Sequence, residues 1–135
     1  MGNADPHALP LAVATAQACE IIGLPECQLN LAQTVAYLAC APKSNAATNA
    51  IFSARKDVSE GSLIPVPRHL RDAHYAGSQQ LGHTNYQYAH ESPDAIAPQE
   101  YLGVDRRYYD PVERGFEIEL RRRLDFIRAR LGEKE

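Results

Sequence analysis

Apolar residues recur at helical spacing in four stretches of the chain, and the most regular of them precedes a proline. Leu31, Val35 and Leu38 are separated by four and three residues, which predicts one apolar stripe along a helix. Asn30 directly precedes this stripe, where its side-chain oxygen can accept an unpaired N–H of the first turn. Pro42 lacks an N–H and cannot continue the helix. The pattern therefore predicts a helix that Asn30 begins and Pro42 ends.

Two more helices are predicted on either side of this one. Ser44 or Asn45 can cap a helix that follows, and its buried side is mostly alanine, so another helix can approach it closely. That side contains Ala47, Ala50, Ile51, Ala54 and Val58. A first helix from about Pro6 to Ile22 has apolar residues on more than one face, and Gly23 ends it. A helix of this kind packs on two sides.

The last predicted helix is amphipathic. Its apolar positions follow steps of four, four, three and four, and they are Phe116, Leu120, Leu124, Ile127 and Leu131. The other faces are highly charged, and Glu117 with Arg121 forms a favourable pair at positions i and i+4. We expect this helix to end near Gly132.

Residues 62–111 lack helical periodicity and contain most of the prolines and tyrosines. We expect short helices after Pro67 and over residues 76–81, and an ordered loop over residues 83–98. Tyr86, Tyr88 and Ile96 are the expected apolar anchors of that loop. The whole pattern predicts an all-α fold, a single compact helical domain over residues 1–135. It combines Ala-rich packed helices, long ordered Pro/Tyr-rich loops and a C-terminal amphipathic helix.

The composition narrows the class of protein. A chain of 135 residues can bury a core without disulfides or metals, and a net charge of −3 argues against a generally basic nucleic-acid-binding surface. Cys19, Cys27 and Cys40 are odd in number and lack CxxC spacing, so we expect reduced intracellular thiols. No apolar run approaches the roughly 20 residues of a membrane helix, so no membrane contact is expected.

Four of the five histidines lie within 22 residues, at His69, His74, His83 and His90. Their spacings of five, nine and seven, without a cysteine among them, do not match a metal site, whose ligands usually come at short fixed spacings. Surface or hydrogen-bonded loop histidines explain the cluster better. The alternative is a free-standing small metal-binding protein or enzyme that uses this histidine loop.

The corner after the second helix offers side chains that could do chemistry. Lys43 beside Ser44 resembles a Ser-Lys dyad, but adjacent residues rarely face each other, and capping suits Ser44 better. Cys40 lies on an apolar helix, where thiols are usually inert packing. Lys43 either stabilises the carbonyls at the helix end or makes an electrostatic contact to a phosphate or to an ATPase module outside this chain. We predict no catalytic, cofactor-binding or metal-binding residue, and Lys43 stays a candidate interaction residue.

Basic residues are concentrated after residue 104, among almost as many acidic ones. One run interleaves guanidinium groups with aromatic rings, which single-stranded nucleic acid uses for phosphate contact and stacking. In the alternative, the two tyrosines anchor a loop to the core and the arginines are solvated. A later arginine run is either a DNA track or a salt-bridged helix face. The candidate DNA contacts are Arg106, Arg107, Tyr108, Tyr109, Arg121 and Arg122.

Short motifs over nearly the whole chain carry a family resemblance. They are Asp5-Pro6, Ala8-Leu9, Gly23-Leu24-Pro25-Glu26, Tyr37-Leu38-Ala39, Ala41-Pro42-Lys43-Ser44-Asn45, Pro65-Val66-Pro67, His69-Leu70-Arg71, Tyr86-Gln87-Tyr88-Ala89-His90, Gln99-Glu100-Tyr101-Leu102, Arg107-Tyr108-Tyr109 and Arg114-Gly115-Phe116-Glu117. In this order they resemble the C-terminal region of the replication-associated recombination protein A (RarA or MgsA) ATPases. These are bacterial AAA+ proteins of the clamp-loader clade, similar to the eukaryotic Werner-helicase-interacting protein. The resemblance implies a structural role for Pro42, Lys43, Ser44, Asn45, Arg114, Gly115 and Phe116.

The resemblance also implies a function. It makes this chain the oligomerising C-terminal domain of an ATPase that assembles as tetramers and acts in replication-fork maintenance, recombination and repair. ATP and Mg²⁺ would bind the parent protein, because no Gly-x-x-x-x-Gly-Lys-Ser/Thr phosphate loop occurs here. We therefore expect this chain to be a non-enzymatic fragment with the ATPase module upstream. The implied partners are further copies of itself, DNA at replication forks and single-stranded-DNA-binding protein. The implied location is the bacterial cytoplasm, at the nucleoid.

Overall fold

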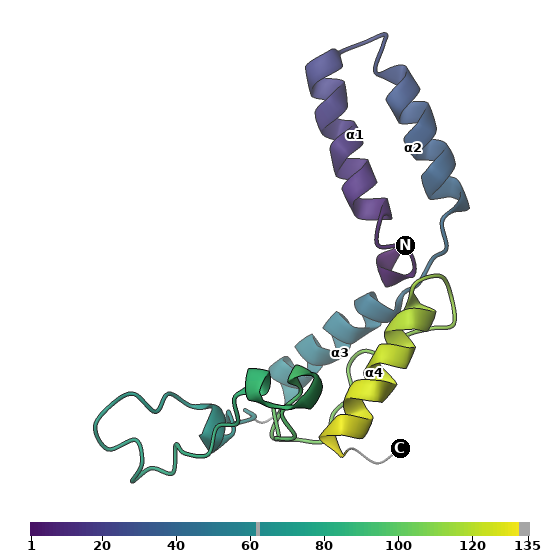
Figure 1. Ribbon diagram of the computed structural model, residues 1–135. Coiled ribbons are helices and arrows are strands. Elements are labelled where there is room, and N and C mark those ends of the chain that lie inside the picture. Colours follow the sequence, from purple (N-terminus) through teal and green to yellow (C-terminus); the bar gives the residue numbers. More distant parts are fainter. Residues whose placement is uncertain (62, 133–135) are drawn as a thin grey trace. The chain divides into compact units, whose positions relative to one another are not determined.

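A computed structural model describes residues 1–61 and 63–132. It contains four α-helices, which are α1 (Ala8–Ile22), α2 (Gln28–Cys40), α3 (Ala46–Glu60) and α4 (Glu117–Leu131) (Figure 1). No strand occurs in the described ranges, so the prediction of an all-α helical fold is confirmed. None of the helices described is long and apolar enough to cross a membrane. Ser62, the first residue of the predicted loop region, lies outside the described residues.

The chain divides into two compact units. One contains Met1–Phe52 and Tyr109–Arg121, and the other contains Ser53–Tyr108 and the C-terminal residues from Arg122. The expectation of one domain over residues 1–135 therefore stays a prediction.

In the first unit, α1 and α2 lie antiparallel as a helical hairpin (Figure 1). Small residues spaced seven apart within each arm of the hairpin are buried along its seam, and they are Ala8 and Thr15 in the first arm and Cys27, Thr34 and Ala41 in the second. A period of seven keeps one stripe of each helix facing the other, and small side chains let the two backbones approach closely. At the middle of the seam the hydroxyl groups of Thr15 and Thr34 form a hydrogen bond.

The expected apolar stripe of α2 is only partly covered, because Leu38 is half-buried and the other two residues are not. Leu31 and Val35 are exposed, whereas Thr34 is buried. The prediction that Asn30 caps the helix is wrong, because α2 already begins at Gln28 and Asn30 lies inside it. Leu31 and Val35 differ from the expectation because hydrophobic periodicity marks the apolar face of a helix without showing what covers that face.

The corner between α2 and α3 forms largely as predicted. The Ser44 Oγ accepts the N–H of Ala46 at 3.0 Å and so caps α3. The expected buried side is wrong for three residues, since Ala47, Ile51 and Val58 are exposed. The side that is covered includes Ala46, which is buried, and Ala50, Ala54 and Asp57, which are partly buried.

The second unit consists largely of loops stabilised by short 3-10 turns at Arg68–Leu70, Ala89–Glu91 and Pro93–Ala95. The turn at Arg68–Leu70 follows Pro67, as predicted, whereas residues 76–81 form hydrogen-bonded turns rather than the expected helix. Tyr86 and Tyr88 are exposed, so they are not the expected anchors, and Ile96 is only partly buried. Buried small or polar residues take that place, and they are Ser78, His83 and Ala97.

Helix α4 begins at a buried acid. Glu117 has an exposed fraction of 0 %, and its Oε2 accepts the N–H of Val112 at 2.7 Å. Glu117 was expected to pair with Arg121 at i,i+4, but its carboxylate accepts this backbone hydrogen bond instead. Arg121 instead donates to the carbonyl of Pro111 and lies 3.6 Å from the carboxylate of Asp110.

Candidate functional site

Two family motifs meet the N-terminal turn (Gly2–Ala4) in the first unit. The guanidinium of Arg114 donates to the carbonyl of Lys43 at 3.3 Å, which joins the second motif to the first. The N–H of Phe116 donates to the carbonyl of Ala4 at 2.9 Å, and the N–H of Ser44 donates to that of Met1 at 3.2 Å. Backbone groups make most of these contacts, so the junction is built for holding segments together.

Gly115 is the tightest point of this junction. Its φ of +52° is in the left-handed region, which side chains disfavour. A Cβ at this position would overlap the carbonyl oxygen of Ala4 and would lie 2.8 Å from Cγ of Pro42. The motif needs glycine because another segment of the chain occupies the space of a side chain.

Lys43 interacts with the end of α2. Its Nζ donates to the carbonyls of Ala39 at 3.4 Å and Ala41 at 3.2 Å. These are carbonyls without helical partners, and a cation near them is favoured by the helix dipole. Lys43 and Ser44 thus each cap a helix rather than forming a dyad.

The arginine-tyrosine run at residues 106–109 is linked to α3. Tyr108 donates its hydroxyl to Oδ2 of Asp57 at 3.1 Å, and Nε of Arg106 lies 3.3 Å from the same oxygen. Burial and this hydrogen bond raise the pKa of Tyr108 above its ordinary value. Asp57 is thus the acceptor that orients both side chains within the second unit.

The remaining candidate DNA contacts also have partners inside the chain. Tyr109 accepts a hydrogen bond from the amide of Asn3 at 3.0 Å, and burial raises its pKa. Arg107 and Arg122 each have an interaction partner as well. With Arg121 held by Asp110 and Pro111, these side chains are arranged as structural contacts.

The histidines of residues 69–90 are engaged one by one. The His69 ring bonds the carbonyl of Glu100 at 2.7 Å, and the His83 ring bonds the hydroxyl of Tyr75 at 3.0 Å. His74 pairs with Asp72, and the backbone N–H of His74 is the main cause of the lowered pKa of that carboxyl. The ring of His90 packs near that of Tyr88. Among the described residues, no three His, Cys, Asp or Glu side chains form a group that could hold a metal.

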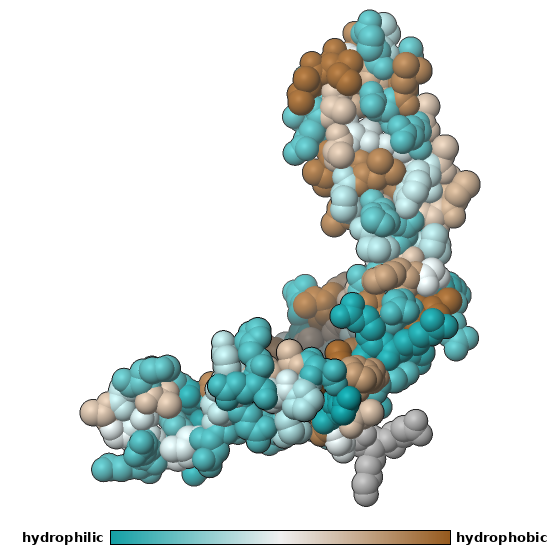
Figure 2. Space-filling view, in the orientation of Figure 1, coloured by the Kyte–Doolittle hydropathy of each residue, from teal (hydrophilic) through white to brown (hydrophobic). Residues whose placement is uncertain are grey.

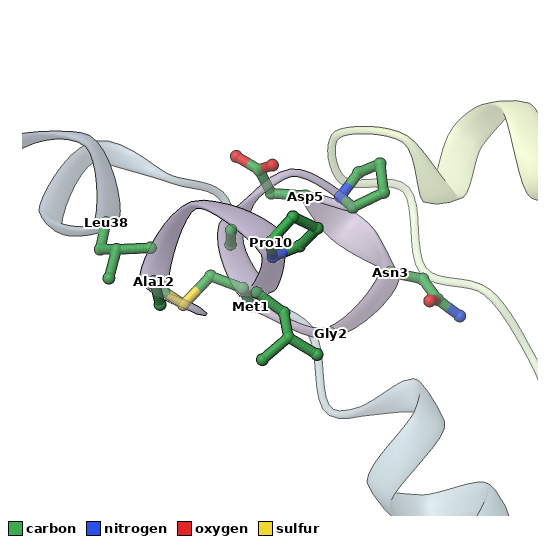
Figure 3. A pocket seen from close by; sticks show the side chains of 10 residues that line it. Met1, Gly2, Asn3, Asp5, Pro10, Ala12 and Leu38 are labelled. Atoms are coloured by element: carbon green, nitrogen blue, oxygen red, sulfur yellow. The ribbon is translucent and has the colours of Figure 1, made fainter. Parts of the chain in front are cut away.

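A pocket of about 660 Å³ lies at the base of the α1–α2 hairpin (Figure 3). The N-terminal turn, the first half of α1 and Leu38 line it, and Met1, Leu9 and Ala12 give it apolar walls. Asp5 is the one carboxylate among these lining residues. It already accepts the N–H of His7 and the hydroxyl of Tyr37, so the pocket lacks a paired acid and base.

The outer faces of the hairpin carry large aliphatic side chains. The exposed fraction is 85 % for Ile21, 78 % for Leu24, 74 % for Leu9 and 66 % for Val35. Figure 2 shows apolar side chains on the surface of this part of the molecule. The only charged residue within α1 and α2 is Glu20. The hairpin is therefore polar and small along its seam and apolar outside.

Sequence reasoning missed several residues that organise these contacts. Thr15 and Thr34 were not singled out, although their seven-residue spacing from Ala8 and Ala41 is visible in the sequence. Asp57 and Glu117 gave no such signal, because a carboxylate on a predicted helix is ordinarily exposed.

Comparison with known proteins agrees with this architecture. The family model described as "MgsA AAA+ ATPase C terminal" matches residues 1–128. An uncharacterized AAA domain-containing protein of Mycobacterium tuberculosis is 46 % identical over 138 residues, which covers 99 % of this chain. The replication-associated recombination protein A of Bacillus subtilis is 38 % identical, with 96 % of this chain covered. The ATPase WRNIP1 of Dictyostelium discoideum is 39 % identical over 95 residues, which cover 70 % of this chain and 11 % of that protein.

The chain spans only part of these relatives, namely 30 % of the Mycobacterium protein and 32 % of the Bacillus protein. The match nevertheless runs through almost all of the present sequence and includes both motifs of the junction. This chain belongs to the family of C-terminal domains of MgsA-type (RarA-type) AAA+ ATPases.

Proposed function

We propose that this chain is the self-association domain of a RarA-type ATPase, and that the α1–α2 hairpin forms its subunit contact. The supporting observation is the outward position of the large aliphatic side chains of the hairpin. Apolar surface left in water costs about 25 cal/mol per Å², and contiguous exposed apolar area commonly marks an interface. Closed symmetric assembly of identical copies covers such a face most simply.

The chemistry of the face favours a second copy as its partner. Glu20 in α1 and Glu26 in the turn are the only charges of the hairpin, so the surface offers few groups that would select an acidic or basic partner. The apolar pocket next to the hairpin base extends this surface. The tetrameric state implied by the family resemblance is the expected size of the assembly.

Sedimentation of the chain at micromolar concentration tests this proposal. The wild type should sediment as a dimer or tetramer, and Val35→Glu should shift it towards monomer, because a desolvated carboxylate opposes association. Val58→Glu is the matched control, since Val58 is also exposed but lies on α3. A wild-type monomer would refute self-association by this chain, and equal behaviour of both variants would place the contact elsewhere.

The longer protein supplies the rest of the proposed activity. We propose that a module outside this chain binds ATP and Mg²⁺, and that the whole protein acts on DNA at replication forks together with single-stranded-DNA-binding protein. Bacterial cytoplasm at the nucleoid is the corresponding location. The names of the relatives, which include a replication-associated recombination protein and an ATPase, support this assignment. The purified chain should not hydrolyse ATP. ATP turnover by homogeneous protein would contradict the proposal that ATP is bound by a module outside this chain.

A further inference from the structure

Two of the three cysteines meet at the tip of the α1–α2 hairpin. Cys19 lies in the last turn of α1, and Cys27 immediately precedes α2 as the last of the five residues that join the two helices. The Sγ of Cys19 lies 4.0 Å from the carbonyl oxygen of Cys27. The N–H of Gly23 donates to the carbonyl of Cys19, and the N–H of Cys27 donates to that of Gly23. Hydrogen bonds on both sides thus hold the turn that separates the two thiols.

Both cysteines face the inner seam. Cys27 is seven residues before Thr34, and Cys19 is four residues after Thr15, so each continues the stripe that contains the buried threonine pair. Cys27 is buried and Cys19 is partly buried. Burial, together with a hydrogen bond and electrostatic interaction with the Cys27 thiol, raises the pKa of Cys19.

We propose that Cys19 and Cys27 form a modification site, a pair of thiols that a hydroperoxide converts into a reversible intramolecular disulfide. Cys19 is the more exposed member of the pair. After the Cys19 thiol has lost its proton, its sulfur attacks one oxygen of H₂O₂, the O–O bond breaks, and the released hydroxide takes up a proton to give water. The Cys27 thiol then attacks the resulting sulfenic acid, the S–O bond breaks, and a second water leaves with the thiol proton. Two thiols and one H₂O₂ therefore give one disulfide and two waters.

Cys40 provides an internal comparison. It is exposed at the C-terminal end of α2, 13 residues beyond Cys27, which corresponds to about 20 Å along a helix. Two cysteines are bridged only when their Cα atoms are within about 7 Å. The folded chain should therefore select the Cys19–Cys27 pair, although Cys40 is the thiol most accessible to oxidant.

The experiment uses the full chain with Cys40→Ser, which retains only the proposed pair. Treatment with H₂O₂ should lower the mass by about 2 Da, for the loss of two hydrogens, and dithiothreitol should restore it. Cleavage after Glu20 and Glu26 separates the two cysteines, so a disulfide should link the peptide of residues 1–20 to the one that begins at Cys27. A mass gain from oxygen addition without this link would overturn the proposal, as would disulfide formation only between chains.

Two controls keep the outcome interpretable. Cys19→Ser with Cys40→Ser leaves Cys27 alone and should show no 2-Da loss. In the wild type, oxidation in denaturant should yield mixed pairs that include Cys40, whereas oxidation of folded protein should favour Cys19–Cys27 by at least about tenfold. Equal pairing under the two conditions would show that the fold does not select these thiols. Because this comparison uses the wild type, it does not depend on whether the serine variants fold.

Discussion

Single residues decide how the motifs of this chain hold its segments. Gly115 leaves room for the carbonyl of Ala4, while Arg114 reaches the carbonyl of Lys43. Glu117 accepts a backbone N–H from Val112 although it is fully buried. Because burying a polar group is costly unless it is hydrogen-bonded, this contact ties the loop that leads into α4 to the first turn of the helix.

Replacing Gly115 by alanine should lower the free energy of unfolding by more than about 2 kcal/mol. The new Cβ would add overlap with Ala4 to the cost of a positive φ. Gly132→Ala is the control, because Gly132 also has a positive φ of +74° but nothing within 4 Å of its Cβ position. Denaturant titration of both variants measures the free energy of unfolding. Equal losses of stability would mean that the segments around Gly115 can move apart to accommodate the new Cβ.

Tyr108 should make stability fall at alkaline pH. Its pKa is raised in the folded state, so the protonated phenol stabilises the fold fully below the unfolded value of about 10, and this contribution is lost as the pH rises through the folded pKa. Tyr108→Phe should therefore be less stable than wild type near neutrality, with a gap that narrows above about pH 10. Unfolding midpoints of both proteins across this range provide the measurement. A gap that stays constant would exclude the proposed linkage.

At the scale of elements, the hairpin is stabilised by a seam of small residues and one polar pair. Thr15 donates its hydroxyl to the carbonyl of Leu11 at 2.8 Å, so the hydroxyl of Thr34 is the donor in the bond between the two threonines. The pair lies midway along both helices and sets their register, because a shift of either helix would leave a buried hydroxyl unpaired.

A double-mutant cycle tests whether the hydrogen bond between Thr15 and Thr34 couples the two helices. Thr15→Val should cost about 1–2 kcal/mol, because the Thr34 donor loses its acceptor, and Thr34→Val should cost less. The double variant, with an apolar seam, should cost less than the sum of the two changes by about 0.5–1 kcal/mol. Thermal unfolding of the four proteins gives the coupling energy. Strict additivity would show that the two hydroxyl groups act independently.

At the scale of the whole molecule, some candidate interaction residues are paired within the chain, whereas others face solvent. The candidate DNA contacts have interaction partners within the chain. The large aliphatic side chains on the outside of the hairpin are instead exposed. On this ground we propose association between protein copies rather than strand binding by the arginine-tyrosine run.

In the longer DNA-binding protein proposed above, Arg106→Gln should leave the salt dependence of single-stranded DNA binding unchanged. Removing one phosphate-binding cation would lower the slope of log affinity against log salt by about 0.7, and Arg106 is instead paired with Asp57. Arg123→Gln serves as a control of equal charge change on α4. A reduced slope for Arg106→Gln alone would restore this residue as a DNA-binding group.

The sequence by itself determined the elements and the family. Helical periodicity placed all four helices, and the corner at Pro42 and the end of α1 at Gly23 followed from local backbone chemistry. Capping of α3 by Ser44 belongs to the same class, because it depends on a short motif. The need for glycine at Gly115 does not, because it comes from the carbonyl of Ala4. The short motifs sufficed to identify the family, and the match of the family model over residues 1–128 confirms it.

Only the tertiary structure decided which face of each helix is covered, and by what. Periodicity shows where apolar side chains gather, but it does not show whether another helix of the same chain or a second molecule covers them. In the hairpin the seam uses Thr15, Thr34 and alanines, because small residues permit close backbone approach, and Val35 is left outside. Asp57 and Cys27 acquire their roles from neighbours distant in sequence or across a turn, and no local pattern records those contacts.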